Sequence, residues 1–139
     1  MKKLAVVSLL VAAVFLFTAC VQDPFEEYEN FVNDLDVSAR IEDAINGVGQ
    51  GNTSAFFVDE IKTLYEDLGT FDQNNDSALE INQFYSTSVK DLLSAIDERK
   101  VGNYDLAESW LNDAVERYQS AQELYRQFLI KFNHQNNNR

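Results

Sequence analysis

The chain has 139 residues, with 23 acidic and 11 basic side chains and a net charge of −12, which suits one domain beside a targeting segment. The acidic excess excludes nucleic acid as a plausible partner, because phosphate contacts need Lys and Arg side chains. A single cysteine excludes an internal disulfide.

Residues 1–19 have the pattern of an export signal. Lys2 and Lys3 precede an apolar stretch from Leu4 to Phe17, and small residues then follow, as expected before a cleavage site. The apolar stretch is shorter than the roughly 20 residues that a membrane-spanning helix needs. Phe17 is too large for an ordinary signal-peptidase site. We therefore predict an export signal that is cleaved at another kind of site.

The four residues Phe17-Thr18-Ala19-Cys20 have the pattern of such a site. They resemble the lipobox of bacterial lipoproteins. The resemblance implies cleavage between Ala19 and Cys20, a diacylglyceryl group on the Cys20 thiol, and a protein held by lipid on the extracytoplasmic side of the cell membrane. Each buried CH₂ of an acyl chain contributes about 0.8 kcal/mol, and more than one chain is needed for stable anchoring.

The remaining residues, 20–139, carry 23 acidic and 9 basic side chains, a net charge of −14. The charge is uneven, because residues 20–89 hold 15 acids and 2 bases, whereas residues 90–139 hold 8 and 7. Most of this charge is interpreted as solvated surface. The alternative is that the acidic N-terminal half is a contact face for a basic partner or for cations held in the cell wall.

A first long helix is predicted over residues 24 to 48. Asp23 can cap its free N–H groups, and Pro24 suits the first helical position. Its apolar stripe consists of Tyr28, Phe31, Val32, Leu35, Ile41, Ala44, Ile45 and Val48, with a defect near Ser38 and Ala39. Residues 20–23 form the lipidated tether, and three residues between Cys20 and the helix reach only about 10 Å.

A second, shorter helix is predicted from Ser54 to Leu68. Its stripe consists of Phe57, Ile61, Leu64, Tyr65 and Leu68. Phe56, Phe57 and Val58 are consecutive, so they cannot all face inward on one helix. An exposed Phe56 would mark a partner or lipid site, although we favour its being covered by the first helix.

A third helix is predicted from Ala78 to Lys100, with Ser77 and Glu80 as a capping box. Its stripe consists of Ile81, Phe84, Tyr85, Val89, Leu92, Leu93 and Ile96. A fourth helix has the clearest pattern, a seam of Ala107, Leu111, Ala114, Tyr118, Ala121, Tyr125, Phe128 and Phe132. The short turn Val101-Gly102-Asn103 makes these helices antiparallel. Small residues at 88, 95, 107, 114 and 121 predict that they pack closely.

The predicted fold is all-α, an up-and-down antiparallel bundle of three to four helices over residues 24–132. The alternative is a three-helix core with the second helix loosely attached. Residues 133–139 are predicted to be a disordered polar tail. In signal, size and helix order the chain resembles small helical lipoproteins of Gram-positive bacteria, a likeness that implies no activity.

The segment Asp72 to Gln83 has a partial calcium-loop pattern. Asp72, Asn74 and Asp76 alternate as in the first half of an EF-hand. Ser77 replaces the glycine of the sharp turn, however, and Gln83 replaces the closing glutamate. Asn and Asp are also good turn formers, so we favour a structural turn and predict no metal site.

Catalytic residues are not predicted. The only histidine, His134, lies in the polar tail, so it cannot pair with a nucleophile in the folded part. No cofactor is predicted. The leading hypothesis is a non-catalytic binding or accessory module at the cell envelope, with its oligomeric state open. The alternatives are a cation-binding protein using residues 72–83 and an envelope enzyme acting through carboxylates.

Overall fold

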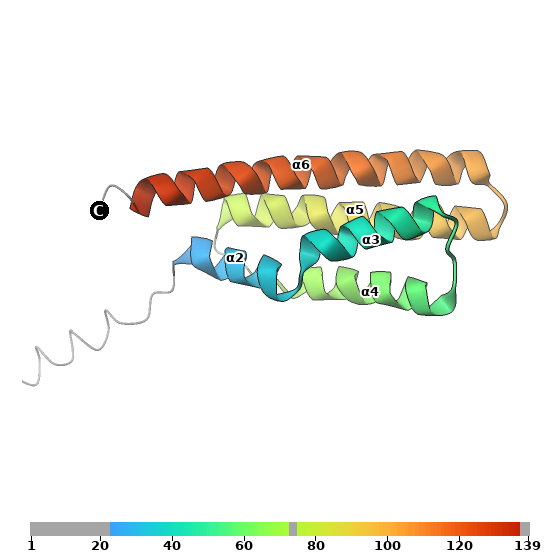
Figure 1. Cartoon of the computed structure of the whole chain (residues 1–139), viewed down its shortest axis with the longest axis horizontal. Helices are drawn as coiled ribbons and strands as arrows, with labels where there is room; N and C mark the ends of the chain where they lie inside the picture. Colours follow the sequence, from blue (N-terminus) through green and yellow to red (C-terminus); the bar gives the residue numbers. More distant parts are fainter. Residues whose placement is uncertain (1–22, 73–74, 137–139) are drawn as a thin grey trace, which may run out of the picture.

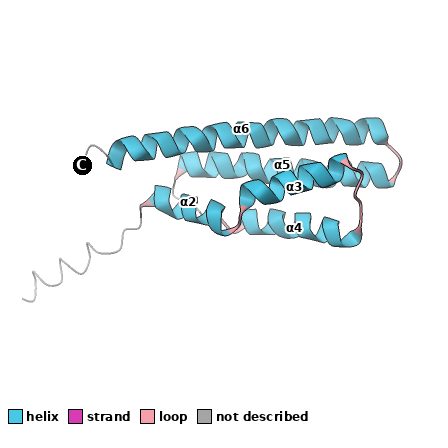
Figure 2. Cartoon of the chain, in the orientation of Figure 1, coloured by secondary structure: helices cyan, strands magenta, loops and turns pink. Residues whose placement is uncertain are grey.

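The computed structural model describes residues 23–72 and 75–136, and in these ranges it is all-α, with no strand (Figure 2). The all-α prediction is therefore confirmed. The described helices are α2 (Pro24–Asp34), α3 (Val37–Gly49), α4 (Ala55–Gly69), α5 (Asp76–Lys100) and α6 (Tyr104–Asn136).

The helices run in alternating directions along one long axis (Figure 1). The first two, α2 and α3, follow one another in the same overall direction, α4 runs back, α5 returns, and α6 runs back again. The start of α2 and the end of α6 therefore lie at one end of the molecule, and the α3–α4 and α5–α6 connections lie at the other. The predicted number of three to four helices is wrong, because five are described.

The extra helix arises from a break in the first predicted helix. Asp36 has a φ of 49° and a ψ of 44°, a left-handed conformation that Asp tolerates better than most residues. In a continuous helix Val37 would project about 140° away from Val32. The break turns the chain so that both side chains are buried. The interruption of the apolar stripe near Ser38 therefore arises because two helices, and not one, cover this segment.

The α5–α6 hairpin confirms the predicted close packing of small residues. Its buried small residues are Ser88, Ala95, Ala107, Ala114 and Ala121, each 0 % exposed. The hydroxyl of Ser88 donates to the carbonyl oxygen of Ala114 at 2.7 Å, a contact that requires the two backbones to lie close together. Gly102, with a φ of 85°, supplies the left-handed turn between them.

Helix α4 belongs fully to the core, so the alternative of a three-helix core is wrong. Its buried residues are Val58, Ile61, Leu64 and Leu68. The predicted stripe is wrong at Tyr65, which is 41 % exposed, and it omitted Val58, which is buried. Phe57 is partly buried and packs against the core as predicted. Asn82 of α5 donates from Nδ2 to the carbonyl oxygen of Leu68 at 2.8 Å, which ties the end of α4 to α5.

Two predicted helix boundaries need correction. The side chain of Asn75, and not that of Ser77, caps α5: its Oδ1 accepts from the N–H groups of Ser77 at 3.0 Å and Ala78 at 3.2 Å. Glu80 is therefore too far along the helix for a capping box. Helix α6 continues to Asn136, so residues 133–136 are helical and not the start of a disordered tail. Residues 137–139 lie outside the described residues.

Aromatic rings close the end of the molecule where α2 begins. Phe25 of α2 stacks near Phe128 and Phe132 of α6, with ring centroids 4.6 Å and 5.3 Å away. The ring centroid of Phe31 lies 4.5 Å from that of Phe71, a residue between α4 and α5. The first described helix is thus held against the rest by large apolar surfaces, which contribute most per residue to burial energy. Among the described residues, no helix is both long and apolar enough to cross a membrane.

Candidate functional site

The predicted lipidation and cleavage residues, Cys20 and Ala19, lie outside the described residues. The description begins at Asp23, whose Oδ1 accepts from the N–H of Phe25 at 3.0 Å. This bond confirms Asp23 as the cap of α2, with Pro24 at the first helical position. Asp23, the last residue of the predicted tether, therefore caps the first described helix.

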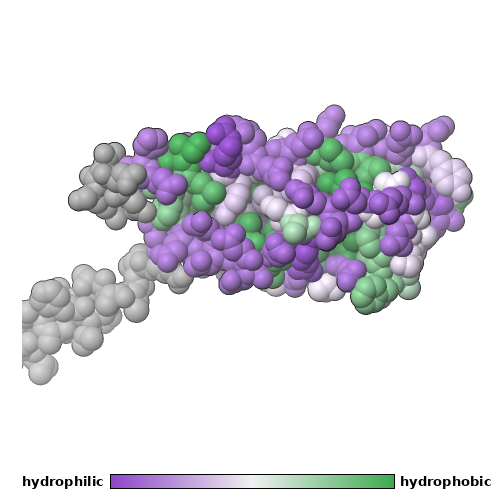
Figure 3. All heavy atoms as spheres, viewed as in Figure 1, coloured by the Kyte–Doolittle hydropathy of each residue, from purple (hydrophilic) through white to green (hydrophobic). Residues whose placement is uncertain are grey.

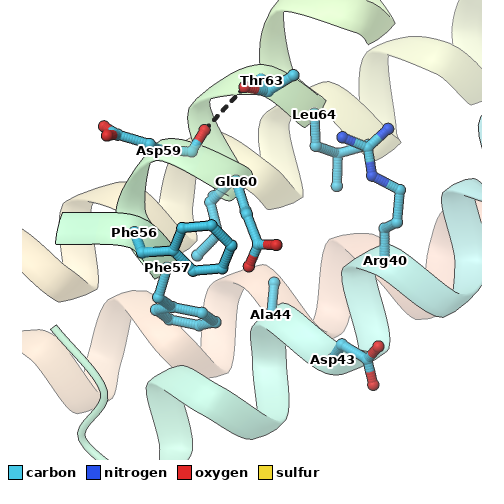
Figure 4. A pocket seen from close by; sticks show the side chains of 10 residues that line it. Arg40, Asp43, Ala44, Phe56, Phe57, Asp59, Glu60, Thr63 and Leu64 are labelled. Atoms are coloured by element: carbon cyan, nitrogen blue, oxygen red, sulfur yellow. Dashed lines mark hydrogen bonds between the residues drawn. The ribbon is translucent and has the colours of Figure 1, made fainter. Parts of the chain in front are cut away.

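A groove of about 390 Å³ lies between α3 and α4, a size at the lower end of ligand and peptide pockets. Figure 4 shows Phe57 and Glu60 of α4 on the side of Ala44 of α3, whereas the carboxylates of Asp59 and Asp43 point outward. The residues that line the groove are Arg40, Asp43 and Ala44 of α3, with Phe56, Phe57, Asp59, Glu60, Ile61, Thr63 and Leu64 of α4.

The floor of the groove is apolar, and a phenylalanine ring closes one end of the groove. Ala44, Ile61 and Leu64 are buried beneath it, and Phe57 closes one end. A Cβ added to Gly47 would lie only 2.4 Å from Cζ of Phe57, which means that the Phe57 ring rests directly on the α3 backbone. A larger residue at position 47 would displace the ring.

The position of Phe57 decides the position of Phe56. Successive residues on a helix point about 100° apart, so Phe56 is turned outward when Phe57 packs on Gly47. Phe56 is 74 % exposed. The prediction that the first helix covers Phe56 is therefore wrong; it is Phe57 that lies against that helix. Figure 3 shows apolar surface at the end of the molecule where α4 begins, on a mostly hydrophilic exterior (Figure 3).

The rim of the groove is acidic. Asp43, Asp59 and Glu60 are all exposed. The one basic lining residue, Arg40, donates from Nη1 to Oδ2 of Asp67 at 2.9 Å, so its charge is balanced by a neighbour. The hydroxyl of Thr63 donates to the carbonyl oxygen of Asp59 at 2.9 Å (Figure 4). Sequence reasoning found Phe56 as a possible partner site, but it did not place these carboxylates beside it.

The buried polar groups elsewhere serve packing. Asp91 of α5, 4 % exposed, accepts from Nε of Arg117 at 2.6 Å, which joins α5 to α6. Tyr118 donates from its hydroxyl to Oε1 of Glu42 at 2.6 Å, which joins α6 to α3. Burial, and secondarily the bond to Glu42, raises the pKa of Tyr118. Asp91 and Tyr118 are buried between helices, and their polar atoms are occupied by these bonds, whereas Glu42 and much of Arg117 remain exposed.

The calcium loop of residues 72–83 remains an alternative hypothesis, beside the predicted structural turn without a metal. Asn74 lies outside the described residues, and Asn75 uses its side-chain oxygen to cap α5. Asp76 occupies the first position of that helix. Within the described ranges, no three His, Cys, Asp or Glu side chains are grouped as a metal site. His134, expected in the tail, lies in the last turn of α6.

Searches with this chain find no matching protein family, no matching curated protein and no matching solved structure.

Proposed function

We propose that this protein is a lipid-anchored, extracytoplasmic module that binds another protein at the cell envelope and has no catalytic activity of its own. The anchoring part of the proposal is supported by the signal pattern and by the lipobox residues that end at Cys20. The binding part is supported by one structural observation, an aromatic side chain held in solvent above an acidic groove.

Exposed Phe56 is informative because a large apolar side chain in water forgoes the free energy of burial. Full burial of a Phe side chain contributes about 1.5 to 3 kcal/mol, and the interior of this protein accepts many aromatic rings. Single exposed apolar residues are common, but Phe56 adjoins further apolar surface and a defined groove. Such continuity is typical of interaction sites. The contact face is therefore assigned to α3 and α4.

The position of the groove suits a tethered protein. We infer an up-and-down bundle that stands on the membrane at the end where α2 begins. The groove lies along α3 and the first half of α4, and Phe56 is close to the end from which α4 starts, opposite the start of α2 (Figure 1). A tether of about 10 Å would keep the first end at the headgroups and leave Phe56 accessible to a neighbouring protein.

Anchoring is tested first, by mass spectrometry of the protein from membranes of its native host. The expected N-terminal residue is Cys20 carrying diacylglycerol, and Cys20→Ser should move the protein from the membrane fraction to the soluble extracytoplasmic fraction. An intact, unmodified residue 20 would overturn the proposal. So would a wild-type protein found among cytosolic material.

Binding is tested by crosslinking in cells and recovery from detergent-solubilised membranes. A photoreactive phenylalanine at position 56 should crosslink to one defined envelope protein. The same residue placed at Tyr65, which is exposed on the same helix but outside the groove, is the matched control. Equal crosslinking from positions 56 and 65 would contradict a contact face at α3 and α4. Crosslinking that Cys20→Ser leaves unchanged would contradict the need for the tether.

A further inference from the structure

We infer that the α3–α4 groove binds a basic peptide segment of the partner, in which a large apolar side chain adjoins Lys or Arg. The inference rests on the proposed binding function and names the chemistry of the partner. It is carried by the juxtaposition of an apolar floor, an exposed aromatic ring and three exposed carboxylates in one groove.

The floor selects for an apolar side chain. Ala44 is the smallest residue in the groove and leaves space between the two helices, whereas Ile61 and Leu64 present buried aliphatic carbon beneath it. The Phe57 ring forms a fixed end wall because it rests on Gly47. A volume of about 390 Å³ accommodates one or two side chains and not a whole second helix.

The rim selects for positive charge. Asp59 and Glu60 follow Phe56 closely on α4, so a cation bound there can contact both a carboxylate and an aromatic face. Ammonium and guanidinium groups are attracted to aromatic rings as well as to carboxylates. Figure 4 shows Phe56 and Glu60 projecting from α4 toward the space above Ala44.

No basic group of the groove is left to compensate these acids. Arg40 is bound both to Asp67 and to the carbonyl oxygen of Leu35, at 2.9 Å and 3.5 Å. Lys62, the other basic residue of the N-terminal half, does not line the groove. An uncompensated acidic rim attracts cations and speeds their encounter with the site.

The same charge disfavours the other possible occupants. Anionic lipid would be repelled by the carboxylates. A second copy of the chain would also be repelled, because residues 20–139 carry a net charge of −14 and the less acidic half still has more acids than bases. The occupant is therefore assigned to a different protein with a basic segment.

Peptide binding to the full chain in non-ionic detergent tests this assignment by fluorescence anisotropy. The probe is a labelled peptide in which lysine alternates with leucine. Its two counterparts carry glutamate in place of lysine, or serine in place of leucine. The lysine–leucine peptide should bind more tightly than either counterpart. Phe56→Ala should weaken binding by about tenfold, as expected of an aromatic anchor, whereas Tyr65→Ala should have no effect.

A second pair of variants tests the charge. Glu60→Gln should weaken binding by about threefold and reduce its dependence on salt. Glu66→Gln removes an equally exposed carboxylate from the same helix outside the groove and should change binding less. Circular dichroism of each variant should match that of the unmodified chain, since all four side chains are exposed.

Three results would overturn the inference. One is equal binding of the lysine and glutamate peptides, another is equal loss with Phe56→Ala and Tyr65→Ala, and the third is no binding at all. Self-association or vesicle binding that Phe56→Ala abolishes would instead assign the groove to a second copy or to lipid. None of these results alters the lipidation of Cys20, so failure here is distinguishable from failure of the proposed function.

Discussion

The α5–α6 hairpin and the α2–α4 segment pack their helices in different ways. In the hairpin, alanine and serine fill the contact, and a side-chain hydroxyl reaches the backbone of the opposite helix. Between α3 and α4 a phenylalanine ring lies against the helix backbone, and a groove remains beside it. Acidic and basic residues are nearly balanced in the second half of the chain, and acids dominate the first.

This difference explains where a ligand could bind. Small residues allow two backbones to approach until no space is left between them. A bulky ring on one side and Ala44 on the other keep the helices apart unevenly, so a hollow forms. The hairpin is therefore the closely packed part of the molecule, and the proposed contact face lies on the α3–α4 pair. Four experiments test this contrast.

The largest expected effect is loss of stability at alkaline pH, because buried tyrosines join the two regions. Burial raises the pKa of Tyr28, Tyr85, Tyr118 and Tyr125, the last to about 12. Unfolded tyrosine ionises near pH 10. Stability should be complete below pH 10 and fall above it, by about 1 kcal/mol per pH unit for each such tyrosine.

Chemical unfolding followed by circular dichroism from pH 8 to pH 12 would measure this slope. Tyr28→Phe is the matched control, since it removes one ionisable group from the interior and should make the slope shallower. The hydroxyl of Tyr28 is buried and has no hydrogen-bond partner in the described part of the chain, so this variant should also be no less stable at neutral pH. A stability that does not change above pH 10 would contradict the buried positions.

The next largest effect is expected from Ala114→Leu in the hairpin. The side chain of Ala114 is 0 % exposed, and a larger one would push α6 from α5 and lengthen the bond from Ser88. We expect the free energy of unfolding to fall by about 3 kcal/mol, measured by denaturant titration. Asn112→Leu, at an exposed position of the same helix, should change it by less than about 0.5 kcal/mol. Equal effects would show that the hairpin is loosely packed.

A smaller effect is expected at the break between α2 and α3. Asp36 is exposed and left-handed, so Asp36→Gly should raise the free energy of unfolding by about 0.5 to 1 kcal/mol by relieving strain. Asp36→Ala should lower it by about 0.5 kcal/mol, since Ala is less tolerant of this conformation. The order Gly, Asp, Ala in melting temperature checks the break. The reverse order would indicate one continuous helix.

The smallest expected effect on stability is that of Phe56→Ala. Because Phe56 is 74 % exposed, its removal should change the free energy of unfolding by less than about 0.5 kcal/mol. Phe57→Ala, on the neighbouring ring that rests on Gly47, should cost about 2 kcal/mol or more. Thermal unfolding of both variants would measure the difference. A large loss with Phe56→Ala would mean that this side chain is part of the core.

The all-α class, the antiparallel arrangement of α5 and α6 and the contact of these helices through small residues could be predicted from the amino-acid sequence. These features depend on local propensity and on a heptad pattern without interruption, which one pairing of helices satisfies. The cap at Asp23 was also predictable, because it depends on a side chain and an N–H group two residues apart.

The break at Asp36 and the outward position of Phe56 follow from packing between helices. Val37 is buried in the core only because the chain breaks at Asp36, and the Phe57 ring occupies the space above Gly47, which turns Phe56 outward. A pattern along the chain gives the preferences of each residue separately. Excluded volume between distant segments determines which preference is met.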